Sequence, residues 1–290
     1  ISVYKLDVPT NDSGQFETGL KIMVEWASKM TLTPAEIEKE RGVVIEEWRT
    51  GQGPATRMRN KHLPVIFAGS RYAQRIPIGE VDVLRNFQRE SLVSFYREWY
   101  RPELISFYAV GDFDAAEVER QIRERFSTLS NPEVPPVRTF YPVPNHSGTK
   151  VSVASDPEAG GNRVIVYNKS EPFRLVTVGD YRELLSYYLY SVMFNTRLEE
   201  ISRSPDAPFL SAGAGRANLV RSKGVMALSA EAPRGGISDS LEAVLIEARR
   251  AQQHGFVESE LERAKRQLLS SMRQLYNNRD SLESSRRADE

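Results

Sequence analysis

The chain contains an internal repeat of one strand followed by two helices, and this repeat constrains the fold more than any other feature. Residues 2–9 alternate apolar and polar side chains, and residues 226–233 repeat this pattern with a similar sequence. An amphipathic pattern follows each segment and predicts a helix, at residues 17–30 and 239–254. Because strands and helices are mixed in both copies, we expect an α+β fold with two homologous domains. Each is expected to be a mostly antiparallel sheet with helices packed on one face.

The second helix of each copy shows where the two copies differ. The segment PAEIEKERGVVIEE at residues 34–47 aligns with ESELERAKRQLLSS at residues 258–271. In this alignment Glu40 corresponds to Ala264 and Glu47 to Ser271, so small residues replace both carboxylates in the second copy. This difference is expected when one of two duplicated domains keeps a functional site and the other keeps only the fold.

The helix that carries these glutamates has a recognisable N-terminal cap, and on one side it places carboxylates beside apolar residues. Thr33 and Glu36 form a capping box, and Pro34 suits the first helical position. Glu40 and Glu47 are seven residues apart, so they stack two turns apart beside apolar residues, on a side that we expect to face inward. Buried carboxylates are costly unless a metal, a base or hydrogen bonds compensate them. A solvated face and a structural network of ion pairs are the alternatives.

Composition limits the classes of function. A length of 290 residues suits about two domains. The 39 basic and 39 acidic residues give zero net charge, so nothing points to nucleic acid or an anionic membrane as a partner. No apolar run approaches the roughly 20 residues of a membrane span. The absence of cysteine excludes disulfides, thiol catalysis and thiolate metal sites, and the three histidines have no helical pair spacing.

A proline-rich segment at residues 131–148 indicates a linker between the two domains. We expect residues 1–130 to be the C-terminal part of an active-type domain and residues 149–290 to be the N-terminal part of a degenerate one. A long segment precedes the repeated strand in the second copy but not in the first. Both domains are therefore expected to be incomplete, and the chain is expected to be a fragment of a longer parent.

Further elements are predicted from local patterns. Residues 104–111 form a nearly continuous apolar run, which is typical of a central strand covered on both faces. Asp114 is expected to cap a helix, because a glutamate follows three residues later. The remaining predicted strands are residues 4–8, 151–154, 163–168, 210–219 and 224–232. The remaining predicted helices are residues 55–67, a helix with Leu92, Phe95, Tyr96 and Trp99 on one face, a long helix from Asp180, and residues 259–275.

Several motifs, taken together and in order, resemble one family of proteases. They are EKERGVVIEEWR at residues 38–49, RIPIGEVDVL at 75–84, FYREWYRPELISFYAVGDFD at 95–114, FNTRLEEI at 194–201 and HGFVESELERAK at 254–265. Because these motifs occur together and in this order, the chain resembles the pitrilysin/insulinase family of zinc metallopeptidases, the inverzincins. Within that family it is similar to the bacterial branch that resembles mitochondrial processing peptidase. The resemblance covers nearly the whole chain and implies duplicated domains, one active and one degenerate.

The resemblance also implies a zinc site. In this family an H-x-x-E-H helix supplies two histidine ligands and the general base, and a distant glutamate completes the metal shell. That glutamate matches Glu47, and Glu40 matches a supporting acidic residue that orients the site. The H-x-x-E-H motif does not occur in this sequence. We therefore expect zinc in the intact parent, whereas this chain alone is expected to be metal-free and catalytically inert.

The implied function is that of a fragment of a zinc-dependent endopeptidase. The intact parent would cleave peptides or unfolded polypeptides in a chamber formed by two halves. The alternative is a non-catalytic peptidase-like homologue that acts as a scaffold or a peptide-binding subunit. The expected partners are a peptide or unfolded protein substrate and a second homologous half or subunit, with no nucleic acid and no membrane span. The implied compartment is the bacterial periplasm, with the cytoplasm as the alternative.

Overall fold

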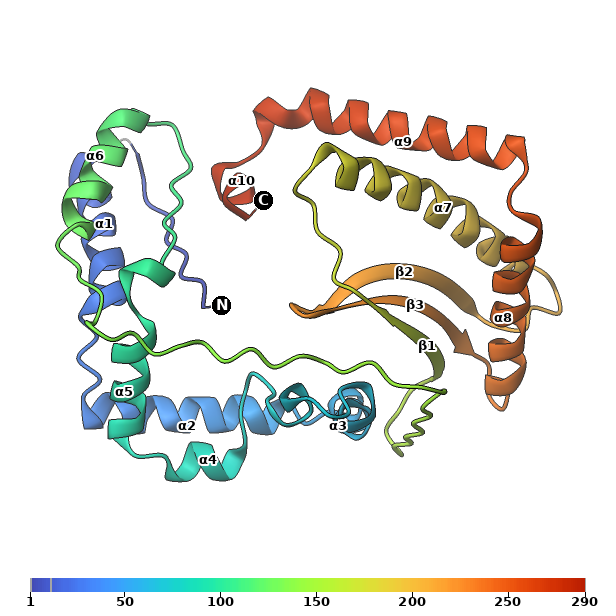
Figure 1. Cartoon of the computed structure of the whole chain (residues 1–290), viewed down its shortest axis with the longest axis horizontal. Helices are drawn as coiled ribbons and strands as arrows, with labels where there is room; N and C mark the ends of the chain where they lie inside the picture. The colour runs from blue at the N-terminus through green and yellow to red at the C-terminus, as the bar shows by residue number, and fades with distance from the viewer. Residues whose placement is uncertain (1, 11, 290) are drawn as a thin grey trace. The chain divides into compact units, whose positions relative to one another are not determined.

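The computed structural model describes residues 2–10 and 12–289, and its contacts group the chain into two compact units (Figure 1). Unit 2 contains the β-sheet, whereas the described part of unit 1 consists of helices and irregular segments. Both units are discontinuous in sequence. Unit 1 comprises Ile1–Thr50, Pro77–Thr139 and Asn278–Glu290, and unit 2 comprises Gly51–Ile76 and Phe140–Asn277.

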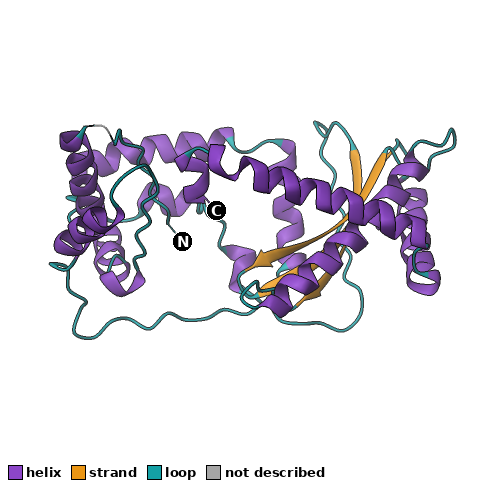
Figure 2. Cartoon of the chain, turned by 90° about the horizontal axis from the view of Figure 1, so that it is seen from above, coloured by secondary structure: helices purple, strands orange, loops and turns teal. Residues whose placement is uncertain are grey.

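The sheet of unit 2 has three antiparallel strands in the order β1-β3-β2. The strands are drawn in orange in Figure 2. They are β1 (Asn162–Ser170), β2 (Ser211–Val220) and β3 (Lys223–Ala232). Leu228, on the central strand, lies opposite Val166 of β1 and Ala214 of β2, which fixes the register on both sides. The predicted antiparallel pairing of the last two strands is confirmed.

Helices cover one face of this sheet. The long helix α7 (Val178–Ser202) packs on β2, and α8 (Ile237–His254) packs on β3 and β1 (Figure 1). The core between helices and sheet includes Phe194 and Leu198 of α7 and Val244 of α8, each at most 1% exposed. The α+β class, with helices on one face of an antiparallel sheet, is thus confirmed for this unit.

Two further helices belong to unit 2. They are α3 (Pro54–Ile66), followed by the short 3₁₀ helix η1 (Arg71–Gln74), and the long helix α9 (Glu258–Asn278). Arg57 of α3 forms a bidentate ion pair with Asp156, with both N···O distances 2.7 Å. This pair ties α3 to the segment that precedes β1, although about a hundred residues separate the two in sequence.

Unit 1 is held together by helix packing and by aromatic side chains. Tyr96 donates to the carbonyl of Trp26 at 2.9 Å, and its ring lies 4.5 Å from that of Tyr100, measured between centroids. The hydrogen bond between Tyr96 and Trp26 fastens the helix Arg89–Trp99 to the helix Ser13–Ser28. The helices of unit 1 are α1 (Ser13–Ser28), α2 (Pro34–Thr50), α4 (Val81–Asn86), α5 (Arg89–Trp99), α6 (Ala115–Phe126) and α10 (Ser284–Asp289), with 3₁₀ turns η2 (Pro102–Leu104) and η3 (Arg279–Ser281).

Three predicted strands are wrong. Residues 4–8, 104–111 and 151–154 have no strand hydrogen bonding, and the first residue of the second segment, Leu104, belongs to a 3₁₀ turn at Pro102–Leu104. These segments have the sequence pattern of a strand. A strand also needs a neighbouring strand that pairs with its backbone hydrogen-bonding groups. The described residues provide no such neighbour for these three segments, and no strand lies among the described residues of unit 1, so the expected sheet of the first domain is not observed there.

The predicted helices and the strands of unit 2 agree closely with the structure. Asp114 accepts a hydrogen bond from the Glu117 amide at 2.9 Å and caps α6 as expected. The long helix begins slightly earlier than predicted, because Thr177 is its N-cap and forms a capping box with Asp180. The domain limits at 1–130 and 149–290 stay a prediction.

Candidate functional site

The candidate site lies on α2, and its start is fixed locally. The Thr33 side chain accepts a hydrogen bond from the Glu36 amide at 3.4 Å, and the Thr33 carbonyl accepts from the Ile37 amide at 3.0 Å. Pro34 occupies the first helical position. The sequence therefore determines the phase of the helix, and with it the positions of Glu40 and Glu47.

One side of α2 is anchored within unit 1. Ile37 is only 7% exposed. Arg41, with a side chain 12% exposed, donates to the carbonyls of Leu84 and Phe87 and stacks on the Phe87 ring at 4.1 Å. These contacts hold α2 against α4 and thereby determine which side of α2 is exposed to solvent.

Glu40 and Glu47 lie on the open side. Both are exposed, so the expectation that they face inward is wrong for this chain. Seven residues of helix correspond to an axial separation of about 10 Å. Val43, between them on the same side, is 55% exposed. Together these side chains form an open strip, which we call the acidic strip of α2 (Glu40, Val43 and Glu47).

The two glutamates of the acidic strip differ from the other glutamates of α2. Within the described part of the chain, neither side chain has an ion pair or a hydrogen bond. The reason is visible in sequence, since no basic residue lies three or four positions from either glutamate. The other three each pair with a base three residues later: Glu36 with Lys39, Glu38 with Arg41, and Glu46 with Arg49. The structure thus does not show the alternative of a structural ion-pair network at Glu40 and Glu47.

The second copy of the repeat shows what the same side of the helix does when it is packed. Ala264 of α9, the counterpart of Glu40, is 1% exposed and belongs to the core of unit 2. Ser271, the counterpart of Glu47, is half-buried. The acidic strip therefore occupies the side of α2 that is covered in α9.

The residues present supply only part of a metal site. Across residues 2–10 and 12–289, no group of three or more His, Cys, Asp or Glu side chains is placed to hold a metal ion. Protein zinc sites use at least three protein ligands. Glu47 offers one carboxylate and Glu40 a second, so the acidic strip fits a contribution to a shared site but does not form a complete one.

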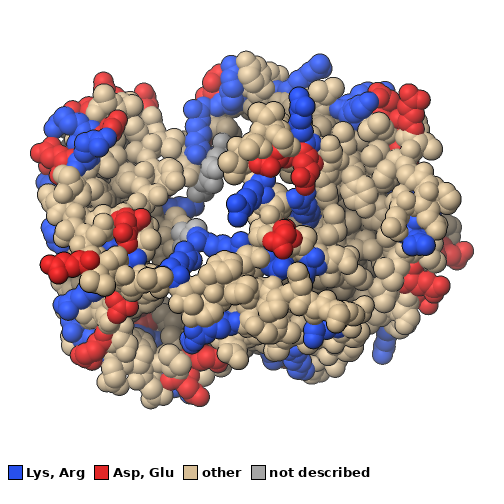
Figure 3. Space-filling view, in the orientation of Figure 1, with Lys and Arg blue, Asp and Glu red and all other residues tan. Residues whose placement is uncertain are grey.

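Charged side chains of both signs occur on the face of the molecule drawn in Figure 3. Acidic and basic side chains occur side by side over much of the face drawn in Figure 3, in keeping with the equal numbers of each in the sequence. Among the helices in the described part of the chain, none is long and apolar enough to cross a lipid bilayer.

Comparison with known proteins places this geometry in a family. A family model described as the Peptidase M16 inactive domain matches residues 86–268. The chain is 30% identical over its whole length to a "Zinc protease PQQL-like" protein of Arabidopsis thaliana, of which it spans 27%. It is 27% identical over 91% of its length to the "Probable zinc protease PqqL" of Escherichia coli, of which it spans 28%. The chain therefore spans about a quarter of the length of these relatives.

A solved structure shows the same fold. The first half of the periplasmic protease PqqL from Escherichia coli superimposes with a TM-score of 0.86 at 24% identity, covering 96% of this chain and 59% of that one. At this identity the match concerns the fold alone.

Proposed function

Because the chain belongs to the M16 peptidase family, we propose that it forms part of a zinc-dependent endopeptidase and that α2 contributes to the metal site. The observation that carries the proposal is the acidic strip of α2. Its two carboxylates are exposed and unpaired, although every other glutamate of the helix has a basic partner. Carboxylates held on a rigid helix without a partner are suited to take a cation as their counter-charge.

The two carboxylates have different proposed roles. Glu47 is the zinc ligand, and Glu40, two turns earlier on the same side, orients the site through hydrogen bonds. Bound zinc would polarise a peptide carbonyl and lower the pKa of a water molecule. The chain itself contributes a negative charge in a fixed position, because the Thr33 cap and the Arg41 contacts hold α2 in place.

The other ligands and the general base lie outside this sequence, which contains no H-x-x-E-H motif. We therefore propose that this chain alone is inactive. The substrate would be a peptide or an unfolded protein, and the partner a second homologous half or subunit. A periplasmic location is proposed by analogy with PqqL, which the solved structure describes as a periplasmic protease.

A second candidate function is that of a non-catalytic scaffold or peptide-binding subunit. The matching family model favours it, since that model describes an inactive domain. The acidic strip favours the endopeptidase, because a subunit without a metal has no need for two unpaired carboxylates on the side that α9 buries.

The experiment that separates these functions restores the missing ligands. A longer protein that carries an H-x-x-E-H segment upstream of this chain is compared with its Glu47→Gln, Glu40→Gln and Glu46→Gln variants. Zinc content and hydrolysis of an unstructured peptide are measured for each. Glu46 is the matched control, because it is adjacent and exposed but pairs with Arg49 on another side of α2.

We expect Glu47→Gln to abolish hydrolysis and to weaken zinc binding by more than the roughly 10–100-fold expected for the orienting residue Glu40. The Glu46→Gln variant should behave like the parent. Equal zinc affinity in the parent and in Glu47→Gln would refute the ligand assignment, and failure of the unmodified longer protein to hydrolyse peptides would favour the scaffold function.

A further inference from the structure

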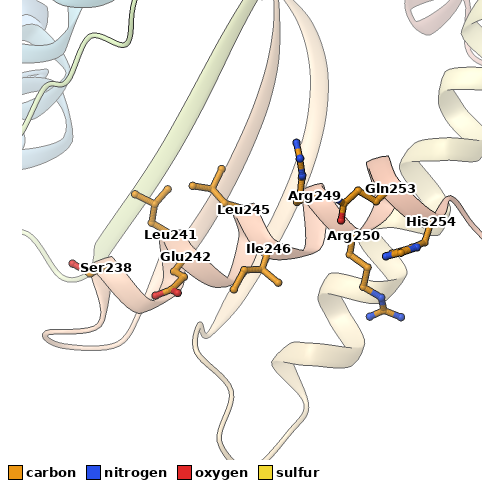
Figure 4. Close-up of a pocket in the computed structure, with 9 residues that line it drawn as sticks. All are labelled: Ser238, Leu241, Glu242, Leu245, Ile246, Arg249, Arg250, Gln253 and His254. Atoms are coloured by element: carbon orange, nitrogen blue, oxygen red, sulfur yellow. The ribbon is translucent and has the colours of Figure 1, made fainter.

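The helix α8 has an open side that the core does not use. Its inner side carries Ser240, Val244 and Glu247, all at most 3% exposed. The opposite side forms an open groove of about 580 Å³ (Figure 4). The residues that line this groove all come from α8 itself, so the groove is a surface along one helix rather than a cleft between elements.

The centre of this surface is apolar. Leu245 and Ile246 are adjacent in the middle of α8 and are 45% and 58% exposed. Two such side chains, side by side on one helix, give an apolar area that water contacts directly. Single exposed apolar residues are common on protein surfaces, so the pattern of charges around this pair decides whether the surface has a partner.

Two opposite charges flank the apolar centre at equal distances. Glu242 precedes it by three residues and Arg249 follows it by three, so they lie two turns apart on the same line of the helix. Glu242 has no ion pair or hydrogen bond within residues 2–10 and 12–289. Arg249 has only a hydrogen bond to the Gln252 side chain at 3.4 Å. Both charges are thus available to a partner.

The surface is complementary to itself when it is turned by 180°. If two copies of α8 cross antiparallel with the twofold axis at the level between Leu245 and Ile246, each Leu245 meets the Leu245 of the other copy, and each Ile246 meets the other Ile246. Glu242 then lies opposite Arg249 in both directions, which gives two equivalent ion pairs. At the ends of the surface, Ser238 lies opposite Gln253, a pair that can form hydrogen bonds. Such reciprocal pairing defines a twofold interface.

We propose that this side of α8, the dimer surface (Ser238, Glu242, Leu245, Ile246, Arg249 and Gln253), binds a second copy of the same chain in an antiparallel arrangement. The occupant follows from the charge pattern, since an unrelated acidic or basic partner would satisfy only one of the two flanking charges. A helix of 18 residues is about 27 Å long, so one helix face gives an interface below the standard size. We therefore expect a weak, concentration-dependent dimer.

The test uses charge reversal and mixing, read by sedimentation velocity over a range of concentrations from micromolar to several hundred micromolar. Glu242→Arg places arginine opposite arginine in a homodimer, and Arg249→Glu places glutamate opposite glutamate. We expect each variant alone to dimerise at least tenfold more weakly than the unmodified chain. A mixture of the two variants should form a heterodimer, because its facing charges are again opposite. Glu262→Arg, an exposed site on α9, is the control for charge alone and should leave dimerisation unchanged.

A second measurement tests the register and does not depend on charge. The chain has no cysteine, so Ile246→Cys introduces a single thiol beside the proposed axis. Mild oxidation should convert it to a disulfide-linked dimer, whereas Arg266→Cys, exposed on α9, should remain mainly monomeric. The proposal is overturned if the unmodified chain is monomeric throughout, if dimers form equally in both charge variants, or if the mixture shows no gain over the separate variants.

Discussion

Arg197 shows how one buried side chain can join three helices. Its side chain is 10% exposed, and its guanidinium donates to Glu260 through Nε at 2.6 Å and through Nη2 at 2.8 Å. Nη1 reaches Glu247 at 3.3 Å, Nη2 also donates to the Gly255 carbonyl, and the group stacks on Phe256 at 4.4 Å. These contacts connect α7, α8 and the start of α9. Bidentate hydrogen bonding of this kind is specific to arginine.

The pairing with Arg197 makes the stability of the chain depend on pH. Hydrogen bonds from Arg197 lower the pKa of Glu260 from 4.5 to about 2. A carboxylate with a depressed pKa stabilises the fold fully above its unfolded value, near 4.5, and this contribution is lost as the pH falls toward 2. We expect Glu260→Gln to lower the free energy of unfolding at pH 7 by about 2 kcal/mol, the scale of a hydrogen bond to a charged group.

Urea unfolding at pH 7, 5, 3 and 2 measures this effect. The difference between the unmodified chain and Glu260→Gln should be constant between pH 7 and 5 and should shrink toward pH 2. Glu262→Gln, which removes an exposed pair with Lys265, is the matched control and should change little. A difference between the unmodified chain and Glu260→Gln that persists unchanged at pH 2 would contradict the assignment.

The sequence predicted the positions of single residues correctly where a short local pattern determines them. The seven-residue spacing of Glu40 and Glu47 placed them correctly on one side of α2, but it could not say whether that side is covered, since covering depends on other segments. Arg197 was not predicted at all, because its partners lie 50 and 63 residues further along the chain. The absence of bases near Glu40 and Glu47 was a usable local signal.

At the scale of elements, the end of β1 lies unusually close to β3. A Cβ atom added at Gly224 would lie 2.5 Å from the Glu171 carbonyl oxygen and 2.8 Å from the Ser170 hydroxyl. A backbone oxygen cannot yield as a flexible side chain can, so the strands would have to separate. We expect Gly224→Ala to lower the free energy of unfolding by about 1–3 kcal/mol.

Gly215 provides the matched control, since it lies on β2 of the same sheet with no atom within 4 Å of an added Cβ. Gly215→Ala should be neutral or stabilise the chain by about 0.4–1 kcal/mol, because alanine has less freedom to lose on folding. Thermal and urea unfolding of the two variants measure the contrast. Equal stability of both would show that β1 and β3 are further apart than described.

Helices were predicted better than strands for a physical reason. The start of α2 at Thr33 and that of α6 at Asp114 depend on side chains within a few residues of the helix, so the sequence contains the whole signal. Residues 4–8 have the alternation of a strand, but a strand is completed by distant hydrogen bonds that no local pattern reports. Strands were predicted correctly where β1, β2 and β3 could pair with one another.

At the scale of the whole molecule, sequence order and contacts divide the chain differently. The helix α3 precedes the proline-rich segment, yet it packs within unit 2 through side chains that follow that segment. Besides the Arg57–Asp156 pair, His62 of α3 contacts the Ser152 hydroxyl at 2.7 Å. Within the segment itself, the Tyr141 hydroxyl accepts a hydrogen bond from Arg71 of η1. Unit 2 therefore needs residues from both sides of the segment.

Cutting the chain in that segment tests this interpretation. Arg138 is exposed in an irregular stretch, so a specific protease site inserted after it should be cleaved readily. We expect the two fragments to elute together in size exclusion at pH 7, because the α3 contacts persist after cleavage. Arg57→Ala should weaken this association, and Arg49→Ala, which loses only a pair with Glu46 on its own helix, should not.

The same contacts give the association a pH limit. Arg57 lowers the pKa of Asp156 to about 2 from its usual 3.8, so the ion pair is intact above pH 4 and is lost as the pH falls toward 2. The cleaved fragments should therefore remain together at pH 5 and separate more readily at pH 2.5. If the fragments of the unmodified chain separate at neutral pH, α3 does not belong to the folded unit of the sheet, and the contacts that place it there do not stabilise the protein.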